Sequence, residues 1–262
     1  MFRLLPLLGL WACHAAPRAS LPLAAGPDST KSAAVRVWKT LPKADLETRL
    51  EAASRALLGR PYLLGPLGEG DSIRGETKPR LRMDAFDCVT YLETSLALAV
   101  SSDSTDILSQ MDTIRYRGGN PFWKERNHFF EGDWLPRNRR FVRLVEFPGD
   151  TVENRLLSRK GFYAKHGVVV DDTLIALRMT PREKAIERWS RASDTTRIRG
   201  VGLVGKVVGY PVLHTAFLIE RKGMPAILRH ASQAGSVREQ PFADYLREKP
   251  KFVGVMVWDW LP

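Results

Sequence analysis

Apolar residues recur at helical spacing in four segments of the chain. In residues 44–58 the shared face carries Leu46, Leu50, Ala53 and Leu57. The apolar run 88–100 predicts a second helix, with Asp87 available as its N-cap. A third helix is expected from about 105 to 117, and a fourth from about 181 to 192, with a proline in its first turn.

The last third of the chain has a different pattern. Segments 200–210, 214–221, 224–230 and 252–260 are short, rich in Val, Ile and Phe, and separated by Gly and Pro, which predicts strands. No internal repeat is present, and no second low-complexity linker divides the chain. Because the helices come first and the strands follow, we expect a single α+β domain.

The first residues have the pattern of an export signal. Arg3 is followed by nine apolar residues, 4–12, whereas a membrane-spanning helix needs about 20. A positive charge, a short apolar core and small residues are typical of a secretory signal. The run ends at Cys13, in a sequence close to the bacterial lipoprotein cleavage site. We therefore expect a signal peptide at 1–13, a flexible tether at 14–36 and one domain at 37–262, in a protein exported to the bacterial cell envelope, either periplasmic or lipid-anchored.

Composition limits the functional classes. With 262 residues, 44% hydrophobic and 26% charged, the chain is neither a polytopic membrane protein, nor a collagen, nor a disulfide-dense miniprotein. The net charge of +11 favours anionic partners such as nucleic acid, acidic lipid or an acidic wall polymer. An evenly basic surface without such a partner is the other interpretation. The secretory signal and the absence of a nucleic-acid motif argue against nucleic acid.

The two cysteines have different expected fates. Cys13 is either removed with the signal or modified with lipid. Cys88 is then a lone thiol, and such a thiol is either buried and inert or reactive. At the start of a helix the free N–H groups and the macrodipole lower a thiol's pKa. Asp87 opposes this effect, so a thiolate would need an imidazolium partner.

Two histidines bound a predicted hairpin, 214–230. If Arg221, Lys222 and Gly223 form the turn, His214 lies directly opposite His230 on the same face, with Cβ atoms about 5 Å apart. One imidazole can then orient the other, as an activated cysteine requires. A register slip of one residue would separate them. Surface histidines or metal ligands are the alternatives, but His128 and His166 lie in separate segments, so a compact zinc cluster is not expected.

Five segments together resemble a known family. They are GRPYLLGPLGEG (59–70), FDCVTYLETSLALA (86–99), IRYRGGNPFWKERNHFFEGDW (114–134), HTAFLI (214–219) and LRHASQAGSV (228–237). The set is similar to the N-acetylmuramoyl-L-alanine amidase-like family, within the NlpC/p60 group of papain-like cell-wall hydrolases, over about residues 45 to 255. Thr215 departs from the small hydrophobic residue that usually follows the histidine.

The resemblance implies a papain-like NlpC/p60 fold of the α+β class, with the nucleophile at the N-terminus of a helix packed on an antiparallel sheet that carries the histidines. It assigns Cys88 as nucleophile, His214 as general base and His230 as the residue that orients it. It also implies substrate contacts from five residues: Tyr62, Arg126, His128, Asp133 and Trp134. For Asp133 and Trp134 a structural role is an equal alternative.

The implied activity is that of a cysteine-dependent N-acetylmuramoyl-L-alanine amidase, which acts on peptidoglycan or muropeptides through a thioester. It needs no metal and no organic cofactor. A γ-D-glutamyl-L-diamino acid endopeptidase, an acyltransferase and a non-catalytic envelope binding protein are the alternatives. The expected partner is the wall polymer, with membrane contact only through a lipid on Cys13 and no contact with nucleic acid.

Overall fold

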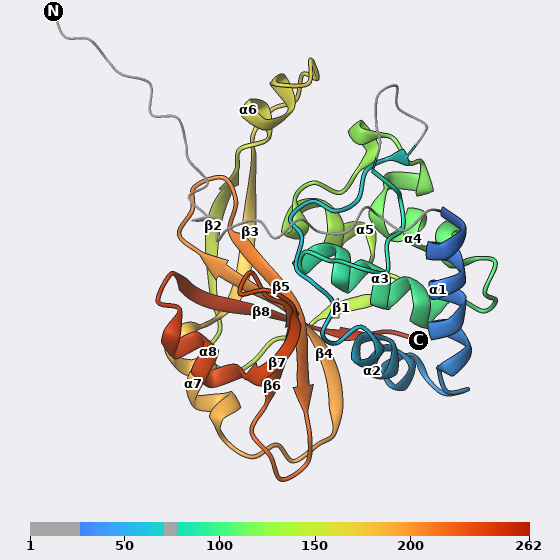
Figure 1. Cartoon of the computed structure of the whole chain (residues 1–262). Helices are drawn as coiled ribbons and strands as arrows, with labels where there is room; N and C mark the ends of the chain where they lie inside the picture. Colours follow the sequence, from blue (N-terminus) through green and yellow to red (C-terminus); the bar gives the residue numbers. More distant parts are fainter. Residues whose placement is uncertain (1–26, 71–77) are drawn as a thin grey trace, which may run out of the picture.

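The computed structural model describes residues 27–70 and 78–262, in which a mainly antiparallel sheet lies between two groups of helices (Figure 1). The strand order is β2-β3-β8-β4-β5-β6-β7, with β1 also paired to β8. The strands are β1 (Val142–Leu144), β2 (Thr151–Leu157), β3 (Thr173–Pro181), β4 (Arg197–Gly205), β5 (Val212–Glu220), β6 (Ile227–Ala231), β7 (Val237–Pro241) and β8 (Phe252–Trp260).

One group of helices precedes the sheet in sequence, and the other interrupts it. The first group comprises α1 (Pro27–Thr40), α2 (Leu46–Ala56), α3 (Cys88–Val100) and α4 (Ile107–Arg115). The opposite face of the sheet is covered by α7 (Arg182–Ser190) and α8 (Phe242–Glu248) (Figure 1). Short elements complete the chain: η2 (Arg117–Gly119), η3 (Trp123–Glu125), η4 (Phe130–Trp134), α5 (Leu135–Arg137) and α6 (Arg159–Ala164). In the described ranges, no helix combines the length and the apolar character needed to cross a membrane.

Separate apolar cores form on the two faces of the sheet. Along β5, Phe217 and Ile219 pack in the core shared with α2 and α3, whereas Ala216 and Leu218 pack toward α7 and α8. This is the alternation expected of a strand buried on both faces. On β4, Gly200 is required by close packing, since a Cβ there would lie 1.9 Å from the Trp258 ring. The predicted α+β class, with an antiparallel sheet and packed helices, is confirmed.

The four predicted helices and four predicted strands all occur, but other elements lay outside the prediction. Strands β1, β2, β3 and β7 were not expected, because β2 and β3 carry many exposed apolar positions and β1 and β7 are short. The tether prediction is wrong for residues 27–36, which belong to α1. There Ala34 is buried and Trp38 donates a hydrogen bond to the carbonyl of Ser101 (3.0 Å), which attaches the helix to the fold. The signal predicted at 1–13 and the tether at 14–26 lie outside the described residues.

The hairpin that carries the histidines has a register two residues from the predicted one. Phe217 pairs with Arg229 and Ile219 with Ile227, so residues 221–226 form a longer connection than the predicted three-residue turn. Pro225 has no N–H for the ladder, and its neighbour Ala226 donates to the carbonyl of Trp189 instead (3.2 Å). A shift of two residues preserves the face of each side chain, so the predicted proximity of the histidines is retained.

Candidate active site

Cys88 is the first residue of α3, and the cap before it is complete. The Asp87 carboxylate accepts the Thr90 N–H (2.8 Å), and the Thr90 hydroxyl accepts the Asp87 N–H (2.9 Å). The Gly65 N–H also donates to the Asp87 carboxylate (3.0 Å). This capping box fixes the first turn of the helix. It therefore fixes the backbone from which the half-buried Cys88 thiol projects.

The segment that contains Tyr62 lies beside this helix start. Leu63 donates to the carbonyl of Phe86 (2.9 Å), and Phe86 donates to the carbonyl of Pro61 (3.0 Å). Tyr62 forms an isolated bridge with Phe86, two residues before Cys88. On its other side, its N–H donates to the carbonyl of Gly235 (2.8 Å). Tyr62 therefore lies on a short extended segment next to the thiol, and its role in substrate contact stays a prediction.

The environment of Cys88 favours the neutral thiol. Burial, followed by the neighbouring Asp87 carboxylate, raises the pKa of Cys88 to about 11, while Thr215 and the Val89 N–H partly oppose the rise. The expectation that the helix N-terminus lowers the pKa of Cys88 is therefore wrong for the protein without substrate. The desolvation of the sulfur and the Asp87 charge outweigh the groups that favour the thiolate. One of those groups is Thr215, the unusual residue after His214.

This pKa gives a direct expectation for alkylation. A thiol with a pKa near 11 is protonated at neutral pH, and iodoacetamide reacts only with the thiolate. The labelling rate of Cys88, followed by mass spectrometry of its tryptic peptide, should rise about tenfold per pH unit between pH 7 and 10. A denatured sample provides the control, in which the rate should level off near the ordinary thiol pKa. Rapid labelling with a plateau below pH 7 would indicate a thiolate–imidazolium pair in the resting protein instead.

The two predicted histidines form a hydrogen-bonded pair. The Nε2 atom of His214 on β5 lies 2.7 Å from the Nδ1 atom of His230 on β6, and the rings are nearly perpendicular at 85°. Both side chains are buried, and burial is the main cause that lowers both pKa values, that of His230 to about 4. Both imidazoles are therefore neutral at pH 7. Since one nitrogen of His214 is held by His230, only its Nδ1 atom is left for another partner.

An irregularity in β5 coincides with His214. Leu203 of β4 pairs with His214, but the next residue, Val204, pairs with Val212, so one residue of β5 is extra at this point. Such a bulge locally changes the direction of the side chains that follow. His214 and Thr215 directly follow the extra residue. Because Thr215 influences the pKa of Cys88, this end of β5 lies near the start of α3.

Tyr245 on α8 is the residue of this site that the sequence pattern did not suggest. Its ring centroid lies 5.1 Å from that of His230 and 6.3 Å from that of His214. Burial, together with the nearby Cys88 sulfur, raises the pKa of Tyr245 to about 12. Tyr245 therefore contacts the histidine pair and lies within electrostatic range of the thiol. In sequence it is one aromatic residue of a short helix, and no spacing distinguishes it.

Arg126 and His128, both from the segment 114–134, lie in different surroundings. Arg126 is half-buried, and its Nη1 atom lies 3.3 Å from Glu69 Oε1. His128 packs against Trp123 and Phe162, with ring centroids at 4.5 and 4.9 Å, and its Nε2 atom lies 2.7 Å from the carbonyl oxygen of Trp123. Burial lowers the pKa of His128 to about 4, so this imidazole is neutral. Substrate contact by Arg126 and His128 stays a prediction.

Asp133 and Trp134 do not line a cleft, which corrects the role that the resemblance implied for them. Trp134 is fully buried, stacks on Phe130 at 4.8 Å and donates to Glu93 Oε1 (3.1 Å). Asp133 is also buried, and its carboxylate accepts the Phe129 N–H (3.1 Å) and binds Arg159 (2.9 Å). Their polar groups are thus occupied within the protein. The structural alternative is the one that applies to these two residues.

Comparisons with known proteins identify the family and the fold of the chain. The model of a family described as N-acetylmuramoyl-L-alanine amidase-like matches residues 52–255. Protein LPG0564 from Legionella pneumophila superimposes with a TM-score of 0.80 at 22% identity, over 90% of this chain and 95% of that one. An N-acetylmuramoyl-L-alanine amidase from Bacteroides uniformis gives 0.64 at 16% identity, over 81% and 99%. At these identities the structures establish a shared fold. Among the curated proteins none matches the chain significantly.

Proposed function

The chain belongs to the N-acetylmuramoyl-L-alanine amidase-like family, and on that premise we propose that it hydrolyses an amide bond of peptidoglycan with Cys88 as the nucleophile. The bond we assign is the one between the muramoyl lactyl group and L-alanine. The observation that carries this proposal is the His214–His230 hydrogen bond next to the start of α3. It leaves one imidazole nitrogen for the Cys88 thiol, which is the arrangement of an activated nucleophile.

The raised pKa of Cys88 and the lowered pKa of His214 determine the first step. Because both groups are neutral at rest, His214 Nδ1 takes the Sγ proton as the sulfur attacks the amide carbonyl carbon. This requires the tautomer in which His214 Nε2–H donates to His230 Nδ1. The oxyanion that forms accepts N–H groups of the first turn of α3 that Asp87 does not occupy.

The second half of the reaction returns the site to its resting state. The His214 imidazolium gives its proton to the leaving amine, the C–N bond breaks, and a thioester remains on Cys88. His214 then removes a proton from water, which attacks the thioester. The carbonyl product leaves as a carboxylic acid, and Cys88 regains its proton from His214. Besides the N–H groups of α3 that stabilise the oxyanion, this sequence of steps needs only the side chains of Cys88, His214 and His230, and water.

The family suggests a role outside the cytoplasm, and we propose export through the signal at residues 1–13. Acylation of Cys13 would hold the protein at a membrane surface, close to the wall. The net charge of +11 is suited to an acidic wall polymer.

The assigned bond is tested by the products. The protein is incubated with a defined disaccharide–tetrapeptide muropeptide, and the products are identified by mass spectrometry. An intact disaccharide acid and a free tetrapeptide are expected. A shortened stem on the sugar would indicate the γ-D-glutamyl endopeptidase instead, and the absence of any product from folded protein would contradict both hydrolase assignments.

The two histidines should differ in their effect on turnover. His214→Ala removes the proton acceptor and should lower kcat by about 10²–10⁴-fold, as is usual for a general base. His230→Ala removes only the group that orients it, so the loss should be at least tenfold smaller. Steady-state kinetics of both variants, with thermal melts to verify folding, measure the difference. Equal losses would contradict the assignment of His230 as an orienting residue.

A further inference from the structure

A large cavity lies at the opposite end of β5 from His214. It has a volume of about 920 Å³ and is bounded by α2, by the start of β4, and by the end of β5 with the turn that follows. From His214 to the wall residue Glu220 the strand advances six residues, or about 20 Å. Cys88, His214, His230 and Tyr62 do not line it. We refer to this cavity as the α2–β5 groove.

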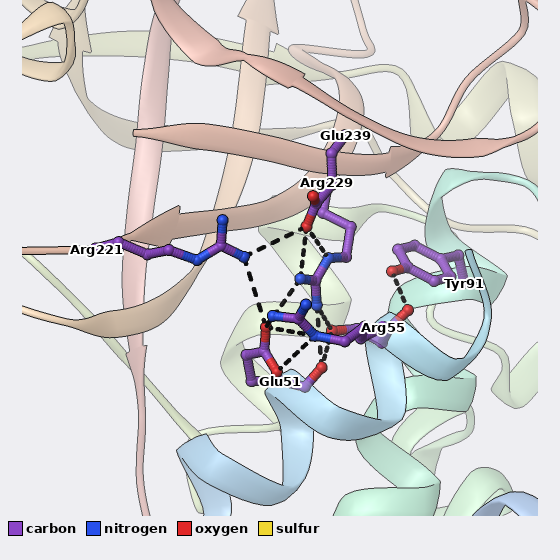
Figure 2. A network of polar contacts seen from close by, with 7 residues as sticks. Glu51, Arg55, Tyr91, Arg221, Arg229 and Glu239 are labelled. Carbon is purple, nitrogen blue, oxygen red and sulfur yellow. Dashed lines mark hydrogen bonds and ion pairs between the residues drawn. The ribbon is translucent and has the colours of Figure 1, made fainter. Parts of the chain in front are cut away.

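Four carboxylate side chains line the groove, and two of them, Glu51 and Glu220, are bound by arginines; Asp45 and Glu47 lie on the α2 side. Glu51 Oε1 accepts from Arg229 Nη2 (2.9 Å) and also pairs with Arg55 (Figure 2). Glu220 on the neighbouring wall is held by Arg199 (2.8 Å). Glu51 and Glu220 are therefore engaged with guanidinium groups of the chain, and Asp45 accepts the Thr48 N–H at the start of α2 (2.8 Å).

Three cations on the β4–β5 side, by contrast, are only weakly paired. The closest carboxylate oxygens to Arg221 Nη2 are 3.8 and 3.9 Å away, beyond hydrogen-bond distance (Figure 2). Arg197 lies 3.5 Å from Asp259, which Arg199 binds more closely at 2.9 Å. Arg197 is also within electrostatic range of the Glu47 carboxylate, without a close ion pair to it. Lys222 forms no ion pair with any residue in 27–70 or 78–262. Arg197 of β4 pairs with Glu220 of β5. Arg221 and Lys222 directly follow Glu220, so the three cations lie close together.

The rest of the groove offers apolar surface. Leu46, Ile198, Ile219 and Trp260 line it between the charged rims. A concave apolar surface with a few convergent polar groups is the usual form of a small-ligand site, and the volume lies within the usual range. Arginine is the side chain best suited to bind a carboxylate, through paired N–H donors.

We propose that the α2–β5 groove binds the carboxylate-bearing end of a peptide chain, with Arg221, Arg197 and Lys222 as the groups that hold the carboxylate. If the proposed wall-hydrolase function holds, the natural source is the stem peptide of a neighbouring wall strand, held about 20 Å from the bond that is cut. The groove is then a second wall-binding site that keeps the enzyme on a cross-linked polymer.

Binding is tested by calorimetry on the full-length Cys88→Ala protein, which cannot turn the ligand over. The ligands are a synthetic stem tetrapeptide with a free C-terminal carboxylate, and acetyl-tetra-L-alanine as a carboxylate peptide without wall chemistry. Adding Arg221→Gln should weaken binding of the stem peptide about tenfold, the effect of losing one charge-assisted hydrogen bond. Arg191→Gln is the matched control. It makes the same charge change on an exposed side chain at the C-terminal end of α7, outside the groove, and should leave binding unchanged.

Equal binding by the Arg221→Gln and Arg191→Gln proteins, or no binding at all, would overturn the proposal. Equal binding of both ligands would identify any carboxylate peptide, rather than the wall stem, as the occupant. The assay requires no turnover, so its failure is distinct from failure of the proposed function. With Cys88 intact, Arg221→Gln should hydrolyse soluble muropeptides at the wild-type rate and cross-linked walls more slowly; equal rates on walls would count against the groove.

Discussion

Replacing Cys88 by alanine is expected to reduce muropeptide hydrolysis by at least about 10³-fold, because no other group can form the thioester. The fold should persist, since the capping box of α3 is built by Asp87 and Thr90 and does not include the thiol. Removal of a half-buried sulfur leaves little empty space. The measurements are kcat on a defined muropeptide and the thermal midpoint of unfolding, which should stay within a few degrees of wild type.

The second cysteine provides the control for this substitution. In protein produced without export, where Cys13 keeps its thiol, Cys13→Ser leaves Cys88 in place, so its hydrolysis of a soluble muropeptide should equal that of the wild type. A folded Cys88→Ala protein that keeps its activity would contradict the role of Cys88. Collapse of the thermal midpoint would instead identify Cys88 as a structural residue of the buried type that the sequence also allowed.

Arg229→Met is expected to cause the largest loss of stability. The Arg229 side chain is fully buried between α2 and the β6–β7 edge, where it donates to Ser54 Oγ (2.7 Å), Glu51 (2.9 Å) and Glu239 (2.6 Å) (Figure 2). Removing one member of a buried ion network leaves its partners desolvated, at a cost of about 3 kcal/mol. For a chain of this size that lowers the thermal midpoint by about 6–12 °C. Since His230 follows Arg229 on β6, hydrolysis should also fall.

Arg55→Met is the comparison variant, because Arg55 also pairs with the Glu51 carboxylate but its side chain is 53% exposed to solvent. Exposed pairs contribute less than about 1 kcal/mol, so the thermal midpoint should change by no more than a few degrees. Equal destabilisation by the two variants would show that burial of the Arg229 network does not determine the stability of this region. Thermal melts followed by circular dichroism measure both.

The elements that sequence could predict are those with a regular apolar pattern. α2, α3 and β8 bury a continuous stripe or run, and β8 begins and ends at the predicted residues. α1 escaped prediction because its polar sequence, rich in Ser, Thr and charged residues, packs only through a few residues such as Ala34 and Trp38. The β5–β6 register depends on Pro225 and on contacts of the turn with Trp189 and Ser193, which no local pattern contains.

The candidate site was predictable where spacing and motif carried the information. The start of α3 at Cys88 and the approach of His214 to His230 follow from sequence, and the structure agrees with both. The pKa of Cys88 did not follow, because its direction is determined by desolvation in the tertiary fold. Tyr245 was missed for the same reason, since its contact with the histidines arises only when α8 packs on the sheet.

Interception of the acyl-enzyme is the most direct test of the mechanism. Hydroxylamine attacks a thioester faster than water does, so a thioester on Cys88 predicts that a muropeptide digested in its presence yields the disaccharide lactyl hydroxamate beside the free tetrapeptide. The mass of the hydroxamate also identifies the bond that was cut. Hydrolysis at an undiminished rate that yields only the free acid would contradict the mechanism, because water would then attack the amide without a Cys88 thioester.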